Sequence, residues 1–153
     1  MRKLQKTIAL SILGVLGLVG CTSPQISGQS STQVSTPVAK MIDRPMYLRG
    51  DFSLWDAEEI YQLQPQGDGT YSVRARFMSL GKVYEFKIAD GSWSQGYNCG
   101  YRFQSVLKLG QPQAADCHTI YNYFSFIPDK KGWFRITFDY REPKKPMVLI
   151  QRD

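Results

Sequence analysis

Trp93 stands in an unusual place for a large aromatic residue, because it follows Gly91 in the stretch YEFKIADGSWS, Tyr84 to Ser94. A ring on a glycine turn is hard to bury in a sheet. An exposed indole can instead cover the C–H face of a sugar, and shielding about 100 Å² at about 25 cal/mol per Å² would contribute roughly 2.5 kcal/mol before the costs of binding. The alternative is that the ring packs against neighbouring loops, and the residues leave both interpretations open.

Catalysis finds little support in this sequence. The single histidine, His118, directly follows Cys117. The adjacent acids Glu58 and Glu59 point in different directions on a strand or helical turn, so they do not form the facing pair that glycoside hydrolysis needs. The sequence has no HExxH motif, GxSxG turn or phosphate-binding glycine loop. We therefore expect a non-catalytic protein that uses no metal and no cofactor.

The first twenty residues have the pattern of an export signal. Three basic residues precede an apolar run, residues 8–19, that is short for a membrane span. The run ends in LVGC, which resembles the bacterial lipobox and implies cleavage before Cys21 and diacylation of that residue. In lipoproteins an aspartate after the cysteine retains the protein in the inner membrane, so Thr22 implies a lipid-anchored protein of the cell envelope, in the outer membrane. An ordinary secreted protein with a spare cysteine is the alternative.

The charge of the mature chain does not indicate nucleic-acid binding. Removal of residues 1–20 takes three basic residues away and lowers the formal charge from +6 to +3. The remaining lysines and arginines are interleaved with acids instead of forming one block, so we expect no nucleic-acid partner.

Once Cys21 carries lipid, Cys99 and Cys117 remain as the one pair of cysteines that can form a disulfide. An exported protein meets an oxidising compartment, which favours this disulfide. A metal site or a catalytic thiol is the alternative, and either would need histidine or acid partners at ligand spacing.

The mature chain divides into a tether and one domain. Residues 21–42 begin with the lipidated cysteine and are rich in Ser, Thr, Gln and Pro, a composition that cannot bury enough surface to fold. Residues 43–153 carry nearly all the aromatic residues and are long enough for one domain. We therefore predict a signal peptide (1–20), a flexible linker (21–42) and a folded domain (43–153).

The domain is predicted to be all β. Apolar and polar residues alternate in TYSVRARF (70–77), VYEFKIA (83–89) and GWFRITFDY (132–140), and EPKKP turns the chain into a last strand, MVLIQ. The alternation turns Lys87 outward, and the short MSLGK segment (78–82) predicts a hairpin between the first two strands. The one helix-like piece, DAEEIYQL (56–63), is at most one short turn. Six to eight short strands favour an immunoglobulin-like β-sandwich.

The order of these pieces resembles a known family. YLRGDFSLWDA, DGTYSVRARF, VYEFKIADGSWS and the segment from Phe124 to Ile150 are similar to the glycogen- and starch-binding modules of the early-set sandwich family, especially the non-catalytic modules of bacterial pullulanases. The resemblance covers about Pro45 to Ile150. The segment from Tyr97 to Thr119, which holds both cysteines, is an insertion relative to the simplest members.

The resemblance implies a ligand site. In the glycogen-binding relatives the glucan stacks on two loop tryptophans and is hydrogen-bonded by a lysine, and the matching residues here are Trp55, Trp93 and Lys87. An Asn pair before the first tryptophan is replaced by Phe52-Ser53-Leu54. Trp133 starts a strand after a glycine and is expected to take part in core or edge packing.

Two functions are therefore predicted. The first is a membrane-tethered, non-catalytic lipoprotein that binds a polysaccharide of the α-glucan type by aromatic stacking. The alternative is an envelope structural or interaction lipoprotein that uses the sandwich to bind a protein partner, as a secretion or assembly accessory. Coplanar, open indoles roughly 10 Å apart would favour sugar stacking. Buried or splayed rings would favour the protein partner.

Overall fold

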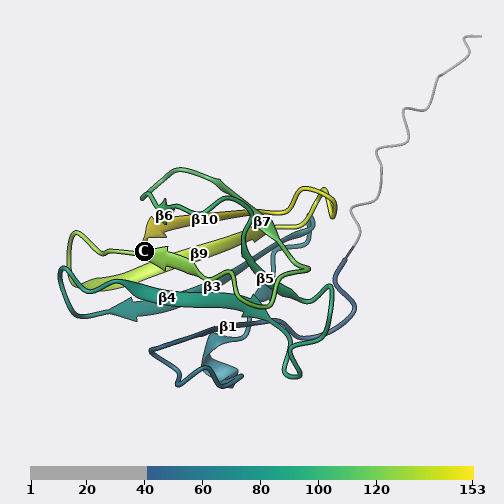
Figure 1. Ribbon diagram of the computed structural model, residues 1–153, viewed down its shortest axis with the longest axis horizontal. Helices are drawn as coiled ribbons and strands as arrows, with labels where there is room; N and C mark the ends of the chain where they lie inside the picture. Colours follow the sequence, from purple (N-terminus) through teal and green to yellow (C-terminus); the bar gives the residue numbers. More distant parts are fainter. Residues whose placement is uncertain (1–40) are drawn as a thin grey trace, which may run out of the picture. The chain divides into compact units, whose positions relative to one another are not determined.

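Two β-sheets pack face to face in the part of the chain that the computed structural model describes, residues 41–153 (Figure 1). One sheet has the order β2-β3-β9-β10-β7, and in the other β4 pairs with β1, β5 and β8, and β6 pairs with β8. The strands are β1 (Tyr47–Gly50), β2 (Gln64–Pro65), β3 (Thr70–Phe77), β4 (Tyr84–Ala89), β5 (Asn98–Tyr101), β6 (Val106–Leu107), β7 (Gln113–Asp116), β8 (Phe124–Phe126), β9 (Gly132–Asp139) and β10 (Met147–Arg152).

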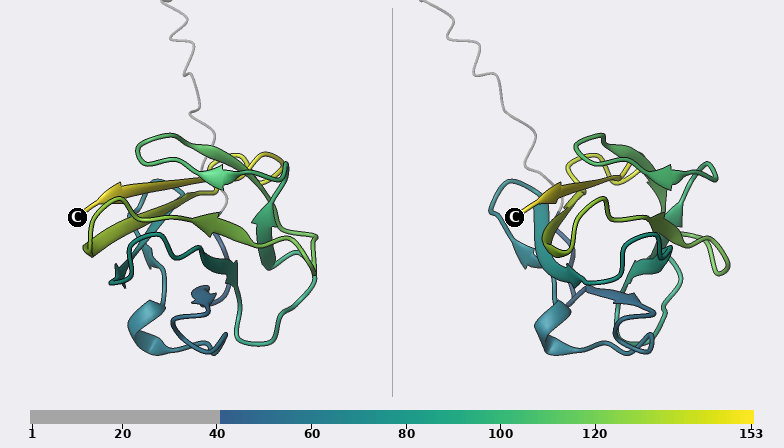
Figure 2. Two further views of the ribbon diagram at one scale, coloured as in Figure 1. Left: turned by 60° about the vertical axis from the view of Figure 1, so that its left-hand side comes forward. Right: turned by 90° about the vertical axis from the view of Figure 1, so that its left-hand side faces the viewer.

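The predicted all-β sandwich is confirmed. Within residues 41–153 the helical content is the single 3-10 turn η1 (Glu59–Tyr61), inside the segment predicted to be at most one short turn. In both views of Figure 2 the loop from β1 to β2, with its 3-10 turn, lies at the bottom of the sandwich. The predicted signal peptide, Cys21 and the linker up to residue 40 lie outside the described residues.

Strand alternation builds an aromatic core between the sheets. In β3 the buried apolar residues are Tyr71, Val73, Ala75 and Phe77, and in β9 they are Phe134, Ile136 and Phe138. The ring of Phe77 lies with its centroid 5.6 Å from that of Phe126 and 5.5 Å from that of Phe134, so one phenylalanine bridges the two sheets. Burying these rings supplies much of the hydrophobic stabilisation.

The predicted hairpin between 70–77 and 83–89 is wrong. β3 pairs along its whole length with β9, whereas β4 lies in the opposite sheet. Residues 78–83 therefore cross between sheets, and the Tyr84 hydroxyl holds this crossing by accepting hydrogen bonds from the backbone N–H groups of Met78 (3.1 Å) and Ser79 (3.0 Å). A short loop between two one-side-buried strands fits a crossing as well as a hairpin. The second predicted turn does form a hairpin, because β9 pairs with β10.

Residues 41 and 42, which precede the predicted domain, contact the sandwich. The Ile42 backbone N–H donates to the Tyr71 hydroxyl at 2.7 Å, and the Ile42 side chain packs against the core. The Tyr71 hydroxyl in turn donates to the Met41 sulfur at 3.8 Å, so both described residues ahead of position 43 contact the sandwich. No helix within residues 41–153 has the length and apolar character needed to cross a bilayer.

The segment from Tyr97 to Thr119 is integral to the sandwich. It contributes β5, β6 and β7, and the pairing of Gly100 and Tyr101 with Asp116 and Ala115 joins the two sheets. The predicted disulfide between Cys99 and Cys117 is present and closes this segment.

We predict that replacing Cys99 and Cys117 together by serine lowers the free energy of unfolding by roughly 3 kcal/mol, because the 18-residue separation sets the loop entropy that the disulfide removes from the unfolded chain. Denaturant titration of the wild-type and double-variant proteins measures the difference. An unchanged midpoint would show that strand pairing alone holds β5 and β7 together.

Candidate functional site

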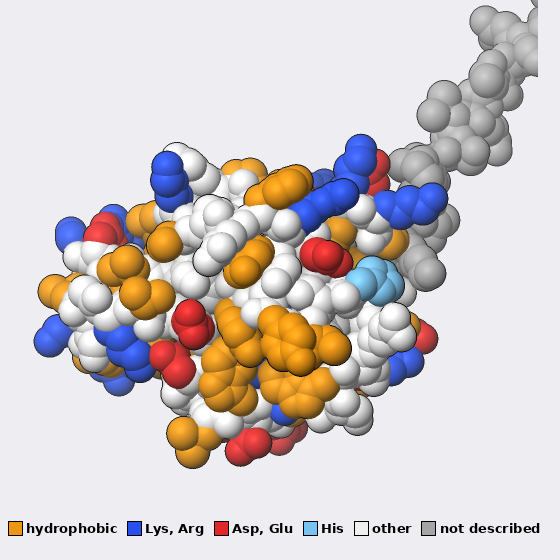
Figure 3. All heavy atoms as spheres, viewed as in Figure 1, with side chains coloured by type: hydrophobic (Ala, Val, Ile, Leu, Met, Phe, Trp, Pro, Cys, Tyr) orange, Lys and Arg blue, Asp and Glu red, His pale blue; other side chains and the backbone are white. Residues whose placement is uncertain are grey.

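The sandwich carries an open pocket of about 440 Å³ lined by Trp55, Lys87, Trp93, Asn98, Ile120 and Tyr123. All three residues that the sequence put forward as ligand-binding residues therefore line one site. Three loops supply its walls: the turn after β1, the turn between β4 and β5, and the loop before β8. Figure 3 shows a hydrophobic patch on the face where β1 and β4 lie in Figure 1.

A tight turn after β1 presents Trp55. The Gly50 carbonyl accepts hydrogen bonds from the backbone N–H groups of Ser53 (3.0 Å) and Trp55 (2.9 Å), and the Ser53 hydroxyl accepts one from Gly50. Gly50 has no room for a side chain, because a Cβ there would lie 2.5 Å from the Glu85 carbonyl oxygen. Leu54 and Trp55 adopt left-handed backbone angles, with φ of 50° and 66°.

The turn after β4 presents Trp93. The Asp90 carboxylate accepts hydrogen bonds from the backbone N–H groups of Ser92 (3.2 Å) and Ser94 (2.8 Å), and Arg44 pairs with its other oxygen at 3.2 Å. Burial alone would raise the pKa of Asp90, but the hydrogen bonds, with Ser94 first, outweigh it and hold the pKa below its usual value. Trp93 itself has a left-handed φ of 57°.

Arg49 connects the two tryptophan turns. Its guanidinium donates to the Trp55 carbonyl (2.8 Å) and to the Asp90 carbonyl (2.8 Å), and its central carbon lies 3.6 Å from the Trp93 ring centroid. This residue is buried in β1, at 6% exposure. Because Arg49 covers one face of the Trp93 indole, a ligand can stack only on the opposite face.

The prediction that Lys87 faces solvent is wrong. Its side chain is 1% exposed, and its ammonium donates to the carbonyls of Thr119 (2.9 Å), Ile120 (3.3 Å) and Asn122 (2.9 Å). These three carbonyls use all the N–H donors of the ammonium. Lys87 therefore fastens the loop before β8 and has no donor left for a ligand.

The loop before β8 lies directly on β5. At Gly100 a Cβ would stand only 1.7 Å from the Asn122 carbonyl oxygen, so the loop could not approach with any larger residue there. The Asn122 side-chain amide donates to the Tyr101 carbonyl at 3.0 Å. Gly100 and Lys87 together fix the position of Tyr123 in the pocket wall.

The aromatic rings form an angled wall instead of a coplanar platform. The centroids of Trp55 and Trp93 are 6.5 Å apart with 43° between the ring planes, and Tyr123 meets Trp55 edge-on at 5.1 Å. Trp93 is 36% exposed and Trp55 is half-buried. The 43° splay is the geometry expected for a protein partner, whereas the opening of both rings into one pocket is the geometry expected for sugar stacking.

Trp133 lies elsewhere and is not in the core, so of the predicted core or edge packing the core alternative is wrong. It is 41% exposed on the outer face of β9, with the Arg74 guanidinium 4.9 Å from its ring centroid. Since Phe134, Ile136 and Phe138 point inward, alternation alone requires Trp133 to point outward. It supplies a matched control for the pocket tryptophans.

Sequence reasoning missed five residues of this site. Tyr123, Asn98 and Ile120 line the pocket, and Arg49 and Asp90 hold its turns. Asp90 could have been found, since Asp followed by Gly and Ser is typical of a turn in which the carboxylate accepts backbone N–H groups. The other four carry no local signal in the sequence.

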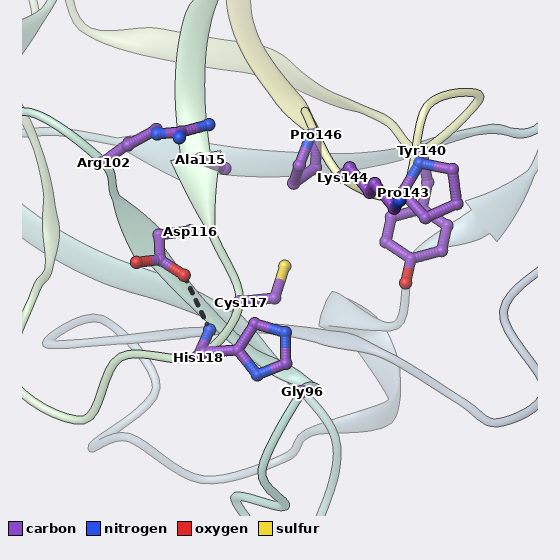
Figure 4. A pocket seen from close by; sticks show the side chains of 10 residues that line it. All are labelled: Gly96, Arg102, Ala115, Asp116, Cys117, His118, Tyr140, Pro143, Lys144 and Pro146. Atoms are coloured by element: carbon purple, nitrogen blue, oxygen red, sulfur yellow. Dashed lines mark hydrogen bonds between the residues drawn. The ribbon is translucent and has the colours of Figure 1, made fainter.

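A second pocket, of about 330 Å³, lies beside the disulfide (Figure 4). Arg102, Lys144 and Tyr140 line it, and the His118 backbone N–H donates to the Asp116 carboxylate at 2.9 Å. Across residues 41–153 no three His, Cys, Asp or Glu side chains gather in a way that could hold a metal ion.

The comparisons with known proteins concern the fold. No protein-family model matches the chain. No curated protein matches it. Among solved structures the chain is similar to one described as "Ligand induced structure of AmyP-SBD", a starch-binding domain, with 14% identity and a TM-score of 0.55, over 93% of this chain and 96% of that one. The two chains share a fold.

We predict that the stability of the protein carries a pH dependence from Lys87. Burial lowers the pKa of Lys87 from 10.5 to about 8. Between these values the unfolded chain binds the proton and the folded chain does not, so folding is favoured increasingly as the pH rises from about 8 to 10.5. The full effect is roughly 3 kcal/mol at most.

Lys87→Met tests this. The variant should be less stable than the wild type at every pH, because three carbonyls lose their donor, and the gap should widen from pH 8 to 10.5 in denaturant titrations. Lys130→Met, at an exposed lysine, controls for the loss of a basic residue. A gap that stays constant with pH would contradict the prediction.

Proposed function

We propose that this protein is a non-catalytic, lipid-anchored carbohydrate-binding protein that takes α-glucan-type ligands by aromatic stacking. The observation that carries the proposal is the pocket in which Trp55, Trp93 and Tyr123 converge on a sandwich with the fold of a carbohydrate-binding module. At about 440 Å³ the pocket lies near the lower end of the roughly 300–1,000 Å³ typical of small-ligand sites.

The angle between the indoles favours a curved ligand. A straight, ribbon-like chain presents its sugar faces in parallel, so it cannot lie flat on two rings inclined at 43°. A chain that turns from one residue to the next can present one face to each ring. This supports an α-linked glucan over a flat polysaccharide. The similarity to a starch-binding domain points to the same ligand class.

The proposed binding is weak for one copy. One free indole face and a partly covered second one contribute a few kcal/mol by area, and the loss of rotation and translation offsets much of this. An affinity between about micromolar and millimolar is expected. Many copies anchored on one surface would act together on a long polysaccharide and raise the overall affinity.

The pocket lacks the side chains that glycoside hydrolysis requires. None of its lining residues is an acid or a histidine, whereas glycoside hydrolysis needs two carboxyl groups about the scissile bond. The proposed role is therefore to hold the polysaccharide near the cell envelope.

We predict that Trp55→Ala and Trp93→Ala each lower the affinity for glycogen at least tenfold, since each removes an indole that faces the ligand. The measurement is affinity electrophoresis of the full chain, purified in non-ionic detergent, in native gels with and without glycogen or amylopectin. Trp133→Ala is the matched control, because it removes an exposed indole outside the pocket and should migrate like the wild type. Wild-type mobility that is the same with and without glucan would count against the proposal.

The second candidate is an envelope protein that binds another protein. Three large side chains stand exposed in the pocket loops, Leu54 at 84%, Ile120 at 68% and Tyr121 at 78%, and such an apolar rim is typical of protein-binding surfaces. An unchanged glycogen mobility would favour this candidate.

The lipid anchor is proposed from LVGC at residues 18–21. We predict that Cys21→Ala prevents incorporation of radiolabelled palmitate in growing bacteria and moves the protein out of the outer-membrane fraction, since two or three acyl chains are what hold it on the bilayer. Cys99→Ala should still incorporate the label. Labelling that persists in Cys21→Ala would contradict lipidation at this residue.

A further inference from the structure

One polar side chain in the aromatic pocket has no hydrogen-bonding role in the free protein. Asn98 lines the pocket from β5 and is 7% exposed, and its Oδ1 has no hydrogen-bond partner within the described residues. Burying an amide oxygen without a partner costs free energy, and native structures contain few such atoms. An unpaired amide oxygen in a pocket wall is therefore a candidate acceptor for a hydrogen bond from a ligand.

The fold does not need this amide. The Asn98 backbone pairs with Ala89 of β4, and its N–H donates to the Cys117 carbonyl. An apolar side chain at this position would keep both interactions and remove the desolvation cost. The asparagine is thus unfavourable for the stability of the free protein.

Two other polar side chains near the pocket, Lys87 and Asn122, are already engaged in hydrogen bonds. The Lys87 ammonium is held by three carbonyls, and the Asn122 amide donates to the Tyr101 carbonyl. The indoles of Trp55 and Trp93 can only donate. Among the lining side chains, the acceptors are the amide oxygen of Asn98 and the hydroxyl of Tyr123.

We propose that Asn98 is the specificity-determining residue of the pocket, and that its amide oxygen accepts a hydrogen bond from a hydroxyl group of the sugar stacked on the indoles. This inference rests on the proposed function and deepens it. Oδ1 is shielded in the free protein, and the terminal torsion of asparagine has a broad profile, so the amide can turn to meet the ligand. The pocket then selects ligands that carry hydroxyl donors beside an apolar face.

A pair of soluble probes tests this selection. β-Cyclodextrin and permethylated β-cyclodextrin both present sugar C–H faces, but the permethylated form has no hydroxyl donors. We expect the wild-type full chain in non-ionic detergent to bind β-cyclodextrin about tenfold more tightly than the permethylated form, measured by quenching of tryptophan fluorescence. In Asn98→Leu, which is similar in size, this ratio should fall to near one.

The melting temperatures of Asn98 variants distinguish a residue that contacts the ligand from one that stabilises the fold. If Asn98 serves the ligand, Asn98→Ala and Asn98→Leu melt at or above the wild-type temperature while β-cyclodextrin binding weakens five- to tenfold. Asn122→Ala is the matched control, because it removes an amide that does have a partner and should melt at a lower temperature.

Three results would overturn the inference. Unchanged β-cyclodextrin affinity in both Asn98 variants would show that the amide makes no contact, while the carbohydrate function would stand. A lowered melting temperature in both variants would assign Asn98 to the fold. Wild-type protein that binds neither glycogen nor β-cyclodextrin would remove the proposed function and this inference with it.

Discussion

The contact between Arg49 and the two tryptophan turns is the interaction on which the pocket depends. The Arg49 guanidinium donates hydrogen bonds to the backbone carbonyls of Trp55 and Asp90, one in each turn. It also makes a cation–π contact with one face of the Trp93 ring. Burial lowers the pKa of Arg49, with Asp56 and Asp90 opposing, yet an arginine stays protonated. Because β1 carries this residue, the edge of one sheet sets the spacing of two loops that are almost forty residues apart in the chain.

Lys87 holds the loop before β8, the third wall of the pocket, in the way that Arg49 holds the two tryptophan turns. A buried ammonium is costly unless several dipoles surround it, and here three carbonyls of one loop do so. The two cations stand opposite each other in the β1–β4 pairing, since Arg49 is the register partner of Lys87. Two buried cations, Arg49 and Lys87, therefore hold the pocket. Arg49 donates hydrogen bonds to backbone carbonyls of the two tryptophan turns and Lys87 to those of the loop before β8, and these carbonyls stabilise the two charges.

The sequence predicted what depends on short-range patterns and missed what depends on pairing across the sandwich. Alternation identified β3, β4 and β9, the EPKKP turn identified β10, and the cysteine count identified the disulfide. Alternation also predicted, wrongly, that Lys87 points into solvent, because an alternating pattern cannot show that a distant loop covers that face of β4. The same limit explains why the predicted hairpin is a crossing between the sheets. It also explains why Tyr123 and Asn98 were missed, because they reach the pocket through contacts between parts of the chain that are far apart in sequence.

Positive-φ strain at non-glycine residues, within the described part of the chain, is confined to the two tryptophan turns. The non-glycine residues with positive φ in residues 41–153 are Leu54, Trp55 and Trp93, and all three belong to the tryptophan turns. Such conformations persist only where surrounding contacts determine them, and their cost is met when the chain folds. The rings are thus in place before a ligand arrives. Association can then proceed at a rate set by diffusion and orientation, without a loop rearrangement, and weak binding would be reached through rapid release.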